Sequence, residues 1–152
     1  MKVSGVLETV GAERLSDSIN RYGNFIHLHN ARSEPLSTSY PVLSRIEDAA
    51  TIAKSGIILV CPLDGTNEGN PAMWQERVPH AAAINTAAFS LVGDVHLDPA
   101  HSLEDHLERH PGDFLPMTNL SALWITTISE THALQRAFGL LNPSSILSFS
   151  LQ

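Results

Sequence analysis

Alternation of hydrophobic and polar side chains is the clearest pattern in the chain. Over residues 89–97, apolar side chains and Gly93 occupy every second position, and polar ones such as Asp94 and His96 occupy the others, with Val92 as the exception. A period of two is typical of a β-strand with one buried face. Similar apolar runs bounded by turn residues predict strands at 3–10, 25–29, 45–54, 57–61, 114–118, within 122–141 and at 146–151.

Two short helices interrupt these strands. Ser102 is a good N-cap residue, Arg109 lies in the last turn, and Pro111-Gly112 ends the second helix. The first helix begins near Ser16 and ends before Gly23. The Ala-rich stretch 78–88 fits either a strand or a short helix, and we favour the strand. The pattern as a whole predicts an α+β protein that is mainly β.

The sequence repeats itself after 88 residues, or 89 once a single insertion is allowed. Seven identities fall within 5–30, where chance predicts roughly one or two. They are Gly5/Gly93, Ala12/Ala100, Leu15/Leu103, Asp17/Asp105, Arg21/Arg109, Phe25/Phe114 and Asn30/Asn119. We therefore predict a tandem duplication of a small antiparallel β-barrel-like unit, each copy with one short helix.

The duplication sets the expected domain organisation. The first repeat spans 1–63, a polar Gly/Asn-rich linker spans 64–77, and the second repeat spans 78–152. Residues 78–88 have no counterpart before Met1. We expect the two repeats to pack as a pseudo-twofold pair, and their exposed sheet edges to pair with each other or with a second chain, which predicts a homodimer.

One string of residues resembles a known group of proteins. Residues 14–21, Arg-Leu-Ser-Asp-Ser-Ile-Asn-Arg, are followed at 25–28 by Phe-Ile-His-Leu. They resemble the core of an uncharacterised family of small bacterial domains, which carry Arg-Leu-Ser-Asp-Leu-Leu-Asn and then Phe-Leu-Pro-Leu-Thr. In the second repeat, the strand at 114–119 matches the family pattern better than the helix does. The resemblance implies no catalytic residue. The strand order is also similar to small barrels of the Sm or SH3 kind.

Charge and composition narrow the function. The 152 residues include 9 Lys and Arg against 16 Asp and Glu, for a net charge of −7, and 43% are hydrophobic. These values exclude a disordered tail and argue against a general nucleic-acid binder. Cys61, the only cysteine, lies in an apolar run and is expected to be a buried, inert thiol. We see neither a signal peptide nor a membrane-spanning run, and expect a soluble cytoplasmic protein.

Four histidines are the main candidates for chemistry. His96, His101, His106 and His110 lie close together in the sequence, and the last two are four residues apart on the expected helix. Imidazoles at this spacing can share one metal ion. The first repeat has Ser18 at the position of His106, so a solvated helix face is the competing interpretation.

Other motifs of catalysis are missing from the sequence. It has no nucleophile elbow, phosphate loop or dinucleotide fingerprint, so we predict no catalytic residue and no cofactor. Trp74, beside the linker, is a candidate anchor for a partner. We expect a non-catalytic binding or assembly module. One alternative is a metal- or small-ligand-binding protein, or an unrecognised enzyme, that uses the region from His96 to His110. The other is Sm-like RNA binding, which the net charge disfavours.

Overall fold

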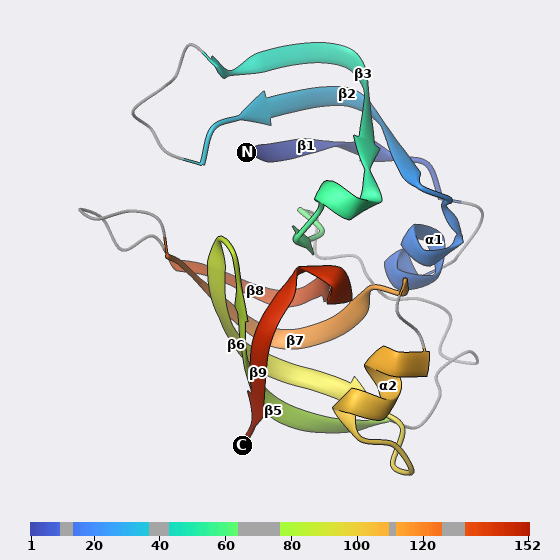
Figure 1. Ribbon diagram of the computed structural model, residues 1–152. Coiled ribbons are helices and arrows are strands. Elements are labelled where there is room, and N and C mark those ends of the chain that lie inside the picture. Colours follow the sequence, from blue (N-terminus) through green and yellow to red (C-terminus); the bar gives the residue numbers. More distant parts are fainter. Residues whose placement is uncertain (10–13, 37–42, 64–76, 110–111, 126–132) are drawn as a thin grey trace.

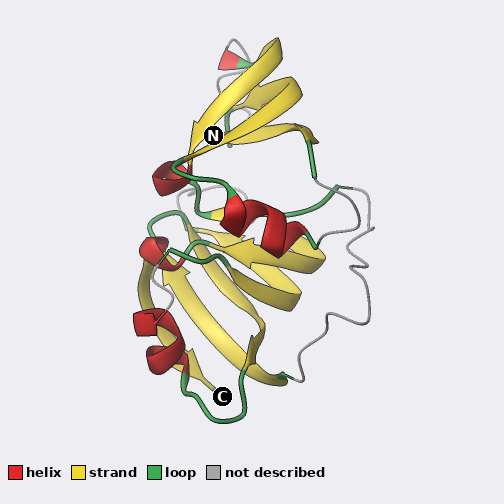
Figure 2. Cartoon of the chain, turned by 90° about the vertical axis from the view of Figure 1, so that its right-hand side faces the viewer, coloured by secondary structure: helices red, strands yellow, loops and turns green. Residues whose placement is uncertain are grey.

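The computed structural model describes residues 1–9, 14–36, 43–63, 77–109, 112–125 and 133–152. They form two antiparallel β-sheets and two α-helices, α1 (Leu15–Arg21) and α2 (Leu103–Arg109), which confirms the mainly-β α+β class. Figure 1 shows the smaller sheet above the larger one. Figure 2, a side view, shows a helix at the boundary between the two sheets, where Figure 1 places α1.

The three-stranded sheet comes from the N-terminal part of the chain, a name we use for residues 1–63. Its order is β1-β2-β3, with bounds β1 (Lys2–Leu7), β2 (Phe25–Glu34) and β3 (Arg45–Ala53). A short 3-10 helix, η2 (Lys54–Gly56), leads from β3 toward β4 (Leu59–Val60). The strand predicted at 57–61 is therefore only two residues long, and it belongs to the larger sheet instead of the three-stranded one.

The six-stranded sheet is built mainly from the C-terminal part, residues 78–152, in the order β4-β8-β7-β6-β5-β9. Its remaining bounds are β5 (Val78–Thr86), β6 (Phe89–Leu97), β7 (Leu115–Trp124), β8 (Ala133–Leu141) and β9 (Ile146–Leu151), with η4 (Pro143–Ser145) before β9. The expectation that 78–88 contains a strand is confirmed by β5. The strand expected within 122–141 is β8.

The two parts share details of geometry at the spacing of the sequence repeat. In the small sheet Ile26 lies opposite Ile52, and in the large sheet Leu115 lies opposite Leu141, each 89 residues later. Asn30 and Asn119 both have positive φ, 49° and 51°, and no other non-glycine residue among those described does. The helices α1 and α2 begin 88 residues apart, and the 3-10 turns at 54–56 and 143–145 begin 89 residues apart, as in the sequence repeat. The shared register therefore extends beyond the identical residues.

Gly5 and Gly93 explain one pair of identical residues. Each lies where the strand register shifts at a β-bulge, in β1 and in β6. A Cβ on Gly5 would lie 2.9 Å from the carbonyl oxygen of His29, and one on Gly93 would lie 2.8 Å from that of Thr118. The backbones approach so closely at both bulges that only glycine fits.

Two expectations about the arrangement of the repeats are corrected. The described strands form open sheets and no closed barrel. The packing is also not a pseudo-twofold: β4 from the N-terminal part pairs with β8, whereas β9, its counterpart 89 residues later, pairs with β5 of its own part. The relation is therefore head to tail. An alternating pattern shows which residues are apolar, but it does not show whether they pack against their own part of the chain or against the other part.

The hydrophobic core has two centres. The larger lies against the six-stranded sheet and includes Ile84, Leu91 and Leu141, with Ile58 and Leu59 of the N-terminal part packed onto it. The smaller joins residues of both parts and is described below. The predicted boundaries at 63 and 78 stay predictions, because most of the linker lies outside the described residues. No helix in the described ranges is long and apolar enough to cross a membrane.

Candidate functional site

His96, the first predicted metal ligand, takes part in a structural contact. It lies on β6, and its Nε2 is 2.8 Å from Oγ1 of Thr118 on the neighbouring strand β7. Burial lowers the pKa of the His96 imidazole, and the nearby Asp94 carboxylate offsets this only in part. The neutral ring is therefore favoured, with one nitrogen already engaged.

The other predicted ligands are dispersed or lie outside the described residues. His101 contacts the Arg109 guanidinium through Nε2, and its Nδ1 lies 3.6 Å from Oδ1 of Asp98. A guanidinium at that nitrogen opposes binding of a cation there. His106 is half-buried on α2, and His110 lies outside the described residues. In the described ranges no three His, Cys, Asp or Glu side chains are placed to hold a metal ion. The four-histidine site stays a prediction, as does Trp74, which also lies outside these ranges.

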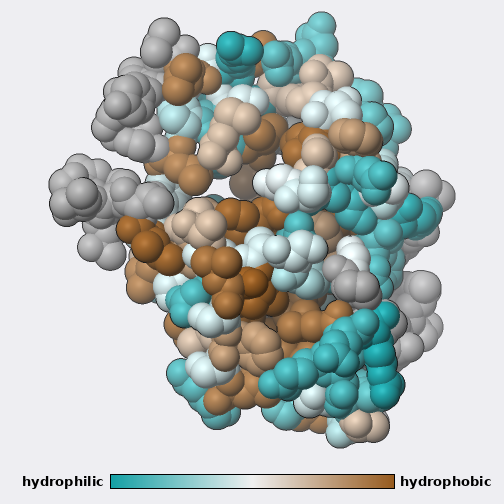
Figure 3. All heavy atoms as spheres, viewed as in Figure 1, coloured by the Kyte–Doolittle hydropathy of each residue, from teal (hydrophilic) through white to brown (hydrophobic). Residues whose placement is uncertain are grey.

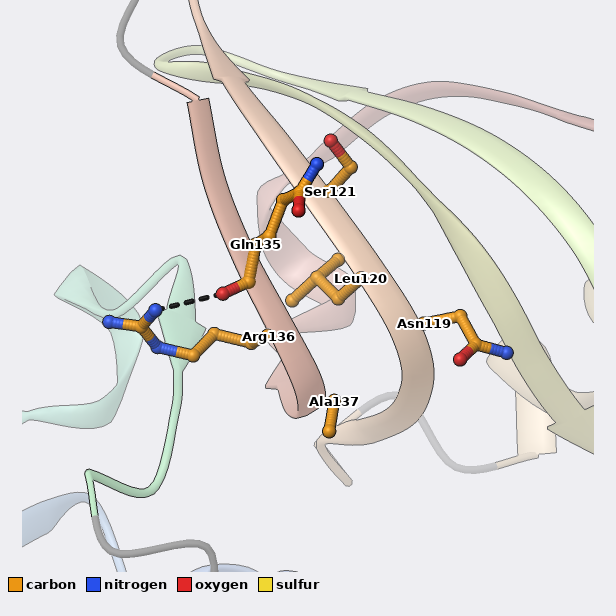
Figure 4. A pocket seen from close by; sticks show the side chains of 6 residues that line it. All are labelled: Asn119, Leu120, Ser121, Gln135, Arg136 and Ala137. Carbon is orange, nitrogen blue, oxygen red and sulfur yellow. Dashed lines mark hydrogen bonds between the residues drawn. The ribbon is translucent and has the colours of Figure 1, made fainter.

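An open hollow of about 440 Å³ lies over β7 and β8. Its lining residues are Asn119, Leu120, Ser121, Gln135, Arg136 and Ala137. Figure 4 shows the Arg136 guanidinium turned toward the carbonyl oxygen of Gln135, to which it donates a hydrogen bond of 2.8 Å. The six lining residues include no carboxylate, imidazole or thiol, so they provide no acid–base pair for catalysis.

The junction between β4 and β8 is the more informative site. Leu59 lies opposite Leu141, and Val60 lies opposite Leu140, so one part of the chain completes the sheet of the other. Cys61 follows β4, and burial raises the pKa of its thiol despite the nearby Arg136. The thiol is therefore held in its protonated, poorly nucleophilic form. The residue is half-buried, however, and not buried as its apolar run predicted.

Asn142 fixes this junction with hydrogen bonds to the N-terminal part. Its side-chain Nδ2 donates to the carbonyl oxygens of Lys54 at 3.0 Å and Ile57 at 2.8 Å, and its backbone N–H donates to Ile58 at 2.9 Å. Its Oδ1 accepts from the backbone N–H of Ser144. Only 5% of the residue is exposed, and its amide satisfies partly buried carbonyl oxygens of the β3–β4 connection.

A shared hydrophobic cluster lies beside this amide. Ile19 and Ile26 from the N-terminal part pack with Phe114 and Leu140 from the C-terminal part, and all four are at most 2% exposed. The backbone N–H of Phe114 donates to Oδ1 of Asn20 at 2.8 Å. The Lys54 ammonium lies 5.7 Å from the centroid of the Phe114 ring, within cation–π range.

The residues that would form the reciprocal junction are exposed. Phe25, the counterpart of the buried Phe114, is 52% exposed, and Leu147, the counterpart of the half-buried Ile58, is 72% exposed. Among the described strands, none pairs with the outer edge of β3 or of β9. The contact between β4 and β8 is thus made within the chain. The equivalent edges, on β9 and on β3, pair with no described strand.

Sequence reasoning missed Asn142 and Asn20 altogether. Each amide bonds to backbone 85 or more residues away, so no local motif marks either one. One available signal was the apolar character of 57–60, which exceeds that of its counterpart 146–149. No protein-family model, curated protein or solved structure matches the chain.

Proposed function

We propose that this protein is a non-catalytic assembly module, built as a tandem duplication in which the last strand of each unit completes the sheet of the next. The observation that carries the proposal is the pairing of β4 with β8. By this rule β9 of one chain would pair with β3 of a second chain. Both edges are unpaired among the described strands, and an unpaired edge presents a row of free N–H and C=O groups.

The register of the second contact follows from that of the first. Moving the β4 residues forward by 89 and the β8 residues back by 89 places Ser148 opposite the partner's Ile52, and Phe149 opposite the partner's Thr51. The observed sheet registers support this transfer, because β2–β3 and β7–β8 already agree at that spacing. The contact is an antiparallel strand addition, whose affinity comes from backbone hydrogen bonds.

Side chains around the transferred register have suitable chemistry. Leu147 is the counterpart of Ile58 and would be the apolar residue that packs against the neighbouring unit. Phe25 of the second chain is the counterpart of Phe114 and would receive it. Glu108 replaces Asn20, so a side-chain oxygen is again available for the N–H of Phe25. Ala53 replaces Asn142 and supplies no side-chain donor. We therefore expect the contact between chains to be weaker than the contact within one.

The proposal also defines the symmetry of the assembly. A contact that joins the end of one unit to the edge of the next is heterologous, so it produces a closed ring or an open filament. Two chains, with four units, form the smallest ring between chains in which each β9 edge pairs with a β3 edge. The predicted homodimer is this case.

Light scattering coupled to size-exclusion chromatography tests the proposal. Wild-type protein should elute as a multiple of the chain mass, and Leu147→Glu should shift the mass toward that of one chain. Because Leu147 is 72% exposed in the single chain, the variant should fold normally. Leu123→Glu is the matched control: Leu123 is 41% exposed on β7, and its counterpart Glu34 shows that the fold tolerates an acid there.

Two results would overturn the assembly proposal. One is a wild-type mass equal to a single chain across a concentration series up to millimolar. The other is a multimer that both glutamate variants leave unchanged, which would place the contact elsewhere.

A further inference from the structure

A hydroxyl group and an imidazole meet on the face of the six-stranded sheet that is turned away from its core. Nε2 of His96 on β6 lies 2.8 Å from Oγ1 of Thr118 on β7, and both residues are half-buried. Burial favours the uncharged ring, as described above. An uncharged imidazole nitrogen at this distance can take the proton of the hydroxyl, which is what makes such an oxygen nucleophilic.

A carboxylate lies next to this pair. Asp94 comes two residues before His96, so its side chain is on the same face of β6, and the register places it directly opposite Thr118. Its Oδ2 accepts a hydrogen bond of 2.6 Å from Nδ2 of Asn119, which holds the carboxylate in place. The negative charge stabilises the imidazolium that forms when His96 takes up a proton. Two neighbouring strands thus bring a carboxylate, an imidazole and a hydroxyl together.

A second pair of histidine and threonine in the chain gives an internal comparison. Nδ1 of His27 lies 3.0 Å from Oγ1 of Thr51 across β2 and β3. Both of these residues are exposed, so water competes for the hydroxyl proton. Phe25 stands two residues before His27, where the other pair has Asp94. Of the two pairs, only the one at His96 combines partial burial with a carboxylate in this position.

The titratable side chains of α2 are in different surroundings. Figure 3 shows hydrophilic residues gathered over the part of the molecule where Figure 1 shows α2. Glu104, Asp105, Glu108 and Arg109 are exposed there, and Asp105 accepts hydrogen bonds from Ser102 at the start of the helix. Water weakens electrostatic effects at such a surface. The half-buried pair on β6 and β7 is therefore the stronger candidate for chemistry.

We propose that Thr118 is a site of covalent acylation by a thioester, with His96 as its general base and Asp94 as a positioning residue. Oγ1 of Thr118 forms a bond to the acyl carbon, and its proton passes to Nε2 of His96. The bond between the acyl carbon and sulfur then breaks, and the leaving thiolate takes the proton from His96. The products are an ester at Thr118 and a free thiol. This site does not depend on the assembly proposed above.

The choice of donor follows from the charge and the surroundings of the hydroxyl. A thiolate leaves readily and can recover a proton from an imidazolium, and a thioester group carries no charge that a chain of net charge −7 would repel. Asn119 and Ser121, one and three residues after Thr118, line the open hollow of about 440 Å³. Thr118 is thus next in its strand to residues that border open space, where a small acyl donor can approach.

Mass spectrometry of the full chain after incubation with S-acetyl-N-acetylcysteamine tests this site. We expect one acetyl group per chain, and peptide fragmentation should locate it at Thr118. Thr118→Val should abolish the modification, and His96→Gln should slow it about a hundredfold. Ser121→Ala is the matched control, because it removes a hydroxyl from a half-buried residue of the same strand and should leave the rate unchanged.

Two variants of Asp94 separate its charge from its structural contact. Asp94→Asn keeps an oxygen that can accept from Asn119 but removes the charge, so acetylation should slow about tenfold or more. Asp94→Glu restores the charge and should recover most of the rate. A merely structural role would give the opposite order, with the longer glutamate side chain the more damaging of the two.

Nitrogen-15 NMR of the wild-type histidines keeps the test independent of any folding defect in the variants. In the uncharged ring of His96 the proton should lie on Nδ1, which leaves Nε2 free to accept from Thr118. A proton on Nε2 would overturn the proposal, because that nitrogen would then donate to the hydroxyl. The proposal is also overturned if acetyl groups appear only on other side chains, if Thr51 reacts as fast as Thr118, or if His96→Gln reacts at the wild-type rate.

Discussion

Replacement of Asn142 by alanine should destabilise the protein more than replacement of an exposed asparagine does. The variant removes two hydrogen bonds donated to the carbonyl oxygens of Lys54 and Ile57, and one accepted from the N–H of Ser144, an exposed residue where water can take its place. Each is worth roughly 1 kcal/mol net, and leaving the partly buried carbonyls unpaired adds about 1 kcal/mol more. The free energy of unfolding should therefore fall by about 2–3 kcal/mol, which corresponds to a loss of about 5–10 °C in Tm for a chain of this size.

Urea denaturation followed by circular dichroism measures this change directly. Asn85→Ala is the matched control, since Asn85 donates an exposed hydrogen bond of 3.1 Å to Oγ of Ser148. Its loss should cost at most about 0.5 kcal/mol. Asn142→Asp should be at least as damaging as Asn142→Ala, because a carboxylate presents only acceptors to the two carbonyls. Equal losses for Asn142→Ala and Asn85→Ala would refute the role of this amide in joining the two parts.

Three further predictions concern single residues. Gly93→Ala should cost about 1–3 kcal/mol, because the new Cβ meets backbone at 2.8 Å, whereas Gly112→Ala, with open space around it, should be neutral in the same thermal melt. Leu140→Ala should cost about 2–5 kcal/mol in urea denaturation. Thr51→Ala, at the exposed counterpart, removes only an exposed hydrogen bond to His27 and should cost at most about 0.5 kcal/mol; similar costs would contradict the shared core. Burial lowers the pKa of His96 below its ordinary 6.5, so its contribution to stability is complete above pH 6.5 and is lost as pH falls through the lowered pKa. His96→Gln should reduce this pH dependence, and an unchanged slope between pH 7.5 and pH 5 would contradict the assignment.

Local patterns predicted most of the strands and one helix cap correctly. The alternation over 89–97 corresponds to β6, and Ser102 caps α2 as expected, with its Oγ accepting from the N–H of Asp105 at 3.1 Å. Such features depend on neighbours within a few residues, which a single sequence displays. The repeat also paired Gly5 with Gly93 as identical residues, and the structure places both at equivalent bulges, which the sequence did not predict.

The destination of β4 could not be predicted in the same way. Phe25 and Phe114 are identical residues at equivalent positions, yet they are 52% and 2% exposed. Their burial depends on whether another unit covers them, and only Phe114 is covered by α1 and the Lys54 turn. The alternation pattern predicts neither this partner nor the role of an amide such as Asn142, whose hydrogen-bond partners lie 85 or more residues away in the sequence.

Disulfide cross-linking between two different chains tests the assembly most directly. In a Cys61→Ala background, chains carrying Ser148→Cys are mixed with chains carrying Ile52→Cys, so that the mixed disulfide can form only between molecules. The transferred register places these two residues opposite each other, at a distance that a disulfide spans. Asp48→Cys, four residues along β3 and about 13 Å away, replaces Ile52→Cys in the control. We predict rapid mixed dimers with Ile52→Cys and few with Asp48→Cys. Equal yields for the two, or no dimer with either, would contradict the pairing of β9 with β3.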